Sequence, residues 1–186
     1  MTADLAEQSA APAQERPAER LERLLAQHSR PLERVAASYG RTAAEREDLL
    51  QEFAVALWTA LPGFRGDCSE RTFILRIAHN RGVTFLSKRS PKSEAVEDYE
   101  ESAEASSGAN PAIAYERKEH GNLLLAATRA LPLPHRQVVT LLLEGLSHHD
   151  FADVLGVSVN NVAVRATRAR AALRVLLGNT QQKEYR

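Results

Sequence analysis

The chain has 186 residues, which is enough for one domain of ordinary size or for two small ones. Hydrophobic residues make up 44% of it and aromatic residues only 5%, which favours helices packed through Leu, Ala and Val over an aromatic-rich sheet. The 24 basic residues are matched by 24 acidic ones, so the total charge neither favours nor excludes a nucleic-acid partner, and the distribution of charge has to decide. A single cysteine, Cys68, excludes an internal disulfide framework and is typical of a reducing cytoplasm.

The first twenty residues are rich in Ala, Pro, Gln and Glu, and we expect residues 1–20 to be a disordered tail. They carry acidic residues and lack the apolar centre of a signal peptide. The chain also has no apolar run long enough to span a membrane. These features predict a cytoplasmic protein.

Residues 21–89 have the pattern of a helical domain. The stretch TAAE, Thr42 to Glu45, is a capping box that predicts the start of a helix. Apolar residues then recur at helical spacing, in the order Leu49, Leu50, Phe53, Ala54, Leu57 and Trp58. Pro62 and Gly63 end this helix, FRGDCSERT forms a loop, and a further helix begins near Phe73.

Residues 90–110 interrupt the helical pattern. Six acidic residues stand there against one base, Lys92, among Ser, Ala and Gly. Such a segment buries too little apolar surface to fold, so we expect a flexible acidic linker. Helices resume after Asn110, and residues 111–178 form a second domain followed by a tail at 179–186. The predicted fold is all-α, with two small helical domains joined by the linker.

The second domain contains a predicted helix-turn-helix in LSHHDFADVLGVSVNNVAVRATRARAAL. Ser147 and Asp150 cap a short helix, Gly156 suits a sharp turn, and Val159 and Val162 are expected to return to the core. No acidic residue occurs between Val154 and Lys183. The arginines in that acid-free run favour contact with phosphate, although a solvated basic helix end is the alternative.

Both domains resemble parts of one protein family. The run DLLQEF, LW, FRGD and RTFILRIAHN resembles region 2 of bacterial RNA polymerase sigma factors, and is most similar to the extracytoplasmic-function (ECF) subgroup of the sigma-70 family. The stretch from LPLPHRQ to RARAAL resembles region 4. The order of the two matches and the linker between them are also those of the family.

The resemblance implies the partners of the protein. It implies core RNA polymerase, through the β′ clamp helices and the β subunit, together with promoter DNA and an anti-sigma factor. Asp48, Gln51 and Glu52 match the positions that dock on the β′ clamp helices. Acidic residues in a first helical turn also complement the helix dipole, which explains Asp48 and Glu52 but not Gln51.

The resemblance also implies two DNA-reading surfaces. The melted minus-ten strand is assigned to the loop and the helix after it, where His79 and Asn80 are expected to face the DNA. The residues of this set are Phe64, Arg65, Arg71, Phe73, Arg76, His79, Asn80, Arg81, Lys88 and Arg89. For Phe64 and Phe73, core packing is an equal alternative to a base pocket.

The minus-thirty-five duplex is assigned to the second helix of the helix-turn-helix. Its residues are Asn160, Asn161, Ala163, Val164, Arg165, Arg168 and Arg170. Ala163 and Val164 replace the basic residue and the serine common in the family. We therefore expect contacts that depend more on DNA shape and phosphate, with apolar contact to thymine methyl groups.

Other site types are not expected. His148 and His149 are adjacent on a helix and point about 100° apart, so they do not readily share one metal ion. No phosphate-binding glycine loop and no nucleophile–base pair with recognisable context occurs, which predicts no cofactor and no catalytic activity. The sequence leaves two rivals to promoter recognition: a sigma-like protein that binds a regulator or polymerase without directing initiation, and a repressor that acts through the helix-turn-helix alone.

Overall fold

The computed structural model describes residues 15–88 and 111–184, and every regular element in these two ranges is a helix. The prediction of an all-α fold is therefore confirmed. The acidic segment 90–110 lies outside the described residues, as do residues 1–14 and Arg89. None of the described helices is long and apolar enough to cross a lipid bilayer.

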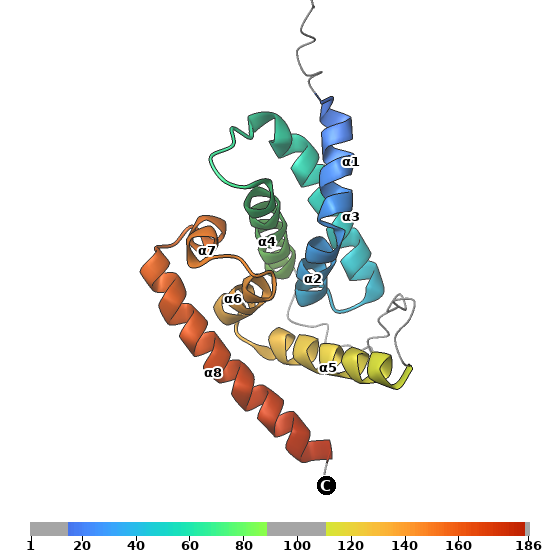
Figure 1. Cartoon of the computed structure of the whole chain (residues 1–186), viewed down its shortest axis with the longest axis vertical. Helices are drawn as coiled ribbons and strands as arrows, with labels where there is room; N and C mark the ends of the chain where they lie inside the picture. Colours follow the sequence, from blue (N-terminus) through green and yellow to red (C-terminus); the bar gives the residue numbers. More distant parts are fainter. Residues whose placement is uncertain (1–14, 89–110, 185–186) are drawn as a thin grey trace, which may run out of the picture.

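The first range folds into four α-helices and one 3₁₀ turn (Figure 1). They are α1 (Pro17–Gln27), α2 (Ser29–Tyr39), α3 (Ala43–Ala60), η1 (Leu61–Gly63) and α4 (Glu70–Lys88). Helix α4 packs against both α2 and α3, and α1 lies on α3. Helix α1 begins at Pro17, inside the segment 1–20 that we expected to be disordered, because proline at the first helical position starts it.

The start of α3 is the predicted capping box. The Thr42 hydroxyl accepts the Glu45 N–H at 3.1 Å, and the Glu45 carboxylate accepts the Thr42 N–H at 3.2 Å. The buried stripe of α3 is narrower than its apolar pattern suggests. Leu49, Phe53 and Leu57 are fully buried, whereas Trp58 is 48% exposed. The apolar spacing predicted Trp58 in the same stripe, which is wrong, because the side chain lies on the solvent face of α3.

The contact between α2 and α4 depends on a glycine. A Cβ atom on Gly82 would lie 2.3 Å from a ring carbon of Tyr39, which is far inside van der Waals contact. Tyr39 is buried, and its hydroxyl lies 2.9 Å from Nδ1 of the buried His79. Gly82 is therefore the position at which the two helix backbones approach closely enough to hold this ring.

The second range contains four helices: α5 (Pro111–Ala130), α6 (Leu133–Leu143), α7 (His148–Leu155) and α8 (Val159–Glu184). The long helix α8 packs across α5, α6 and α7 and forms one side of the molecule in Figure 1. It continues to Glu184, past the end of the domain expected at residue 178.

The two ranges pack on each other. Helix α7 lies against α4, and α2 contacts both α5 and α6. Buried residues of both ranges belong to one continuous apolar cluster. The two predicted domains are thus in direct contact in this structure.

Candidate nucleic-acid interface

The helix-turn-helix of α7 and α8 forms from local signals in the sequence. The Ser147 hydroxyl accepts the Asp150 N–H at 3.2 Å, and the Asp150 carboxylate accepts the Ser147 N–H at 3.1 Å, so the predicted cap is confirmed. Gly156 has a φ of 64°, a left-handed conformation that favours glycine. The Val157 N–H then donates to the Ala152 carbonyl at 3.1 Å and closes the turn.

One apolar residue of this motif is placed differently from expectation. Phe151, Val154 and Val162 are buried, but Val159 is 44% exposed. Val159 is the first residue of α8, where the neighbouring Ser158, Asn160 and Asn161 are exposed as well. The expectation that Val159 returns to the core is therefore wrong.

The first two turns of α8 present amide and apolar side chains to solvent. Asn160, Asn161 and Val164 are exposed, and Ala163 is half-buried. Amides form hydrogen bonds with base edges, and a valine methyl group packs on a thymine methyl group. This end of α8 thus has the chemistry expected of a reader of duplex DNA.

The arginines of α8 follow the same helix. Arg168 and Arg170 are exposed and Arg165 is half-buried. No acidic residue lies between Val154 and Lys183, so within the described part of α8 no carboxylate of the helix competes with DNA for these guanidinium groups before Glu184. Guanidinium groups in such a run suit phosphate oxygens.

The predicted minus-ten surface begins with two aromatic rings in contact at a tilted angle of 39°. The ring centroids of Phe64 and Phe73 are 4.5 Å apart. The guanidinium of Arg20 lies 5.3 Å from the Phe64 centroid, and that of Arg76 lies 5.7 Å from the Phe73 centroid. Phe73 is only 7% exposed, which favours a packing role for this ring, whereas Phe64 is half-buried and reaches the surface.

Helix α4 and the loop before it carry the polar residues of this surface. Arg65, Asn80, Arg81 and Lys88 are exposed, and Arg76 is half-exposed. Exposed cations suit the backbone of single-stranded DNA, and an exposed amide suits a base edge. Arg71 differs, because its guanidinium contacts Glu144 of the second range.

His79 does not face the DNA side. Its side chain is 1% exposed and packs edge-on against the Tyr39 ring, with centroids 5.8 Å apart. The expectation for His79 is therefore wrong, while the neighbouring Asn80 is exposed as expected. At 100° per residue the two side chains point to different faces of α4. Burial lowers the pKa of His79 to about 3.

This depressed pKa predicts how stability changes with pH. The folded protein keeps His79 neutral, whereas the unfolded chain takes up a proton below about pH 6.5, so the free energy of unfolding falls as the pH drops from 6.5 towards 3. We expect a loss of up to about 2 kcal/mol from this group between pH 7 and pH 5. Urea unfolding at both pH values measures it. His79→Asn should flatten the dependence, and the exposed control His148→Asn should not; equal slopes in all three proteins contradict the assignment.

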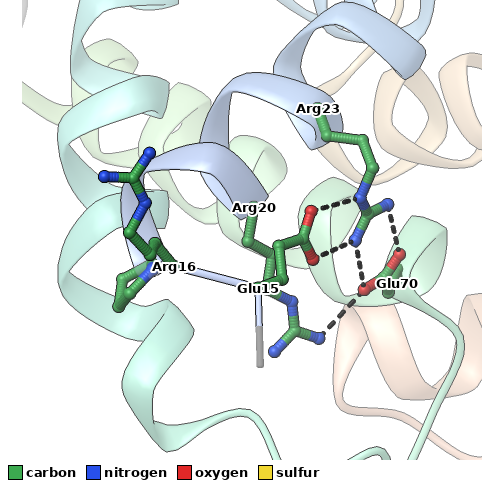
Figure 2. A pocket seen from close by; sticks show the side chains of 6 residues that line it. Glu15, Arg16, Arg20, Arg23 and Glu70 are labelled. Carbon is green, nitrogen blue, oxygen red and sulfur yellow. Dashed lines mark hydrogen bonds and ion pairs between the residues drawn. The ribbon is translucent and has the colours of Figure 1, made fainter. Parts of the chain in front are cut away.

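An ion-pair cluster joins α1 to the start of α4 (Figure 2). Glu70, the first residue of α4, accepts hydrogen bonds from Arg20 at 2.9 Å and from Arg23 at 3.2 Å, and Glu15 accepts from Arg23 at 2.8 Å. Hydrogen bonds from Arg23 and Arg20 hold the pKa of Glu70 below its usual value. No sequence pattern indicates that Arg20 lies near Phe64, because the two residues are far apart in the chain.

The solvent side of α3 is a third surface. Asp48, Gln51 and Glu52 are all exposed, as expected. Val55 and Trp58, at 67% and 48% exposure, continue the same face one and two turns further along the helix. This row of polar then apolar side chains has no covering element among the described residues.

Comparison with known proteins assigns the chain to a family. Residues 24–91 match Sigma-70 region 2, and residues 121–173 match Sigma-70 region 4. The ECF RNA polymerase sigma-E factor of Escherichia coli K12 is 30% identical over 134 residues, which cover 68% of this chain and 70% of that protein. The chain is an ECF sigma factor. The RNA polymerase sigma factor NccH of Alcaligenes xylosoxydans xylosoxydans is also similar, with 29% identity over 85% of this chain and 87% of its own length.

Solved structures agree with the assignment of this sigma factor. A structure of CnrH in complex with the cytosolic domain of CnrY has a TM-score of 0.62 and 27% identity, and covers 86% of this chain and 88% of that one. The sigma factor RpoE of Bartonella quintana, in complex with the anti-sigma factor NepR, shares the fold at a TM-score of 0.68 and 20% identity, over 86% of this chain and 98% of that one.

The function of this sigma factor follows from its family: it binds core RNA polymerase and directs promoter recognition for transcription initiation. Sigma factors are initiation factors rather than enzymes. This function replaces the two alternatives that the sequence left open, a sigma-like protein that does not direct initiation and a repressor that acts through the helix-turn-helix alone.

Proposed function

We propose that the exposed face of α3 docks this sigma factor on the β′ clamp helices of core polymerase. The proposal is supported by the exposure of Asp48, Gln51 and Glu52 on the side of α3 opposite its buried stripe. It extends the predicted set by Val55 and Trp58, since exposed aromatic and aliphatic groups beside polar ones are typical of an interface centre.

Replacement of the exposed tryptophan tests this extension. Trp58→Ala should weaken the affinity for core polymerase by about tenfold or more, because a large apolar contact is lost. The thermal midpoint should change little, since Trp58 is 48% exposed. Titration of labelled protein with core enzyme gives the affinity. Tyr115→Ala, which removes a 69% exposed aromatic residue from α5, is the matched control; equal affinities for both variants contradict the extension.

The loop between η1 and α4, together with the exposed side of α4, is proposed to hold the melted minus-ten strand. Arg65, Asn80, Arg81 and Lys88 supply phosphate and base-edge contacts, with Arg76 beside Phe73. Phe64 is the ring available for a base, because Phe73 is buried beneath it. Arg89 belongs to the proposed set but lies outside the described residues.

The N-terminal turns of α8 are proposed to read the minus-thirty-five duplex. Asn160 and Asn161 offer amides to base edges, and Ala163 and Val164 offer apolar contact. Arg165, Arg168 and Arg170 bind the flanking phosphates. The acid-free exposed run of α8 is the observation that carries this assignment most directly.

A further proposed partner is an anti-sigma factor, and the proposed site of action is the cytoplasm. In one similar structure the sigma factor RpoE is bound to the anti-sigma factor NepR, and in another CnrH is bound to the cytosolic domain of CnrY. Binding of such a partner hides a sigma factor from polymerase. In the proposed mechanism the sigma factor supplies binding energy for strand separation, and polymerase forms the RNA bonds.

Permanganate footprinting tests the two DNA assignments together. Holoenzyme made from core polymerase and this protein is allowed to select fragments from genomic DNA, and the retained fragments are probed for unpaired thymines. We expect reactive thymines about ten base pairs upstream of the transcript start, at a fixed distance from a protected upstream duplex. Retention of fragments without any reactive thymine contradicts the minus-ten assignment.

A further inference from the structure

A buried carboxylate joins the two halves of the sigma factor. Glu144 follows α6, and its side chain is fully buried. The Arg34 guanidinium on α2 donates to both of its oxygens, at 2.6 and 2.8 Å. From α4, Arg71 Nη2 donates to the Glu144 carbonyl at 2.6 Å and lies 3.3 Å from its carboxylate. Both guanidinium groups therefore come from residues 15–88, and the carboxylate comes from residues 111–184.

Further hydrogen bonds cross the same junction. The Thr72 hydroxyl donates to the Asp150 carboxylate at 3.0 Å, so the start of α4 is tied to the cap of α7. On the other side of Glu144, Arg129 of α5 donates to the carbonyls of Ala37 and Gly40 at 2.8 Å each. These carbonyls lie at the end of α2, where helical carbonyls have no partner within the helix.

Glu144 binds the guanidinium of Arg71, a group that is also assigned to promoter DNA. Arg71 is one of the residues assigned to the minus-ten strand, and a carboxylate and a phosphate compete for the same guanidinium donors. While Nη2 of Arg71 is bonded to Glu144, that donor is not available to DNA.

With α7 packed on α4, the two DNA-reading surfaces are also too close together to contact both promoter elements at once. The two promoter elements lie about 25 base pairs apart, or roughly 85 Å at 3.4 Å per pair. In this structure α7, the first helix of the minus-thirty-five reader, packs directly on α4, which carries the minus-ten surface. The two readers must therefore separate before both engage DNA.

We propose that Glu144, held by Arg34 and Arg71, is an intramolecular latch that keeps the free sigma factor closed. Opening of the latch releases Arg71 for DNA and lets the helix-turn-helix move away from α4. The proposal rests on the proposed function in placing the minus-ten strand on α4, with Arg71 assigned to that strand from the sequence, and the minus-thirty-five duplex on α8. A buried carboxylate is suited to such a role, because removal of its charge takes away the anionic acceptor of both guanidinium groups and leaves Arg71 only the Glu144 carbonyl.

Fluorescence energy transfer in the free protein tests the latch without DNA or polymerase. Dyes are placed at Ser29→Cys on α2 and Val175→Cys on α8, both exposed positions, in a Cys68→Ser background. Glu144→Gln should raise the ratio of open to closed molecules at least about tenfold. Arg34→Gln should shift it in the same direction, and the double variant should open no further than Glu144→Gln alone. Arg34 is half-exposed and its loss leaves the apolar core intact, so this second variant reports on the latch even if Glu144→Gln does not fold.

Glu116→Gln, the same charge change at an exposed position on α5, is the matched control and should leave the ratio unchanged. Equal ratios in the parent, Arg34→Gln and Glu144→Gln proteins overturn the latch.

A second readout links the latch to initiation. At limiting core polymerase, Glu144→Gln should give several-fold more promoter-specific transcript than the parent, and at saturating core the two should be equal. An open population without this gain overturns the competition with DNA. If the parent protein directs no transcript at all, the proposed function fails, whereas the energy-transfer result still decides the latch.

Discussion

Reversal of charge at Arg76 and Arg81 should abolish promoter-specific transcription while leaving the affinity for core polymerase intact. Both arginines lie on α4 with side chains reaching solvent, and neither lies on the docking face of α3. Arg76→Glu with Arg81→Glu replaces attraction for phosphate by repulsion at two positions of α4. We expect at least a 100-fold loss of specific transcript, because each phosphate contact contributes to binding and strand capture.

Run-off transcription and core titration are measured on the same preparations. Arg30→Glu with Arg41→Glu, an equal charge change at two exposed arginines away from α4, is the control and should retain nearly full transcription. Comparable transcription from both double variants contradicts the placement of the minus-ten strand on α4. Loss of core affinity in the α4 variant alone indicates that this surface docks polymerase instead.

The second large effect is expected at Gly82. A methyl group there meets the Tyr39 ring at 2.3 Å, and the ring cannot move freely because it is buried and its hydroxyl is bonded to His79. Gly82→Ala should lower the free energy of unfolding by at least about 2 kcal/mol, the usual range for an overpacked core. Denaturant unfolding measures the change.

Gly121→Ala is the matched control for this prediction. Gly121 also lies inside a helix, α5, but a Cβ atom there meets nothing within 4 Å. Alanine should therefore stabilise the protein by up to about 1 kcal/mol. Combining Gly82→Ala with Tyr39→Ala should cost less than the sum of the two single changes, since the clash is removed. A fully additive result argues against the close approach as the cause.

The features that the sequence predicted well are local ones. The caps at Thr42 and Ser147 and the left-handed turn at Gly156 each depend on residues within one or two helical turns. A side-chain oxygen three residues before a free backbone N–H is enough to specify such a cap. The all-α fold and the helix-turn-helix followed from these signals and from helical spacing, whereas the starts of α1 at Pro17 and of α4 at Glu70 did not.

The features that it missed depend on contacts between distant segments. His79 and Trp58 are each next to both apolar and polar residues, so helical spacing alone did not decide which of them is buried. His79 is buried because it packs against Tyr39, which lies 40 positions earlier in the chain. The contact of Arg34 with Glu144 spans 110 positions, and no local pattern encodes it.

Sequencing the 5′ ends of transcripts made by core polymerase with and without this protein tests the central claim most directly. We expect discrete new starts, each preceded by shared sequence elements near minus ten and minus thirty-five at a constant spacing. The upstream element should change when Asn160, Asn161 or Val164 is replaced, and the downstream element should not. Stable binding to core polymerase with no new starts on its own genomic DNA would contradict the account.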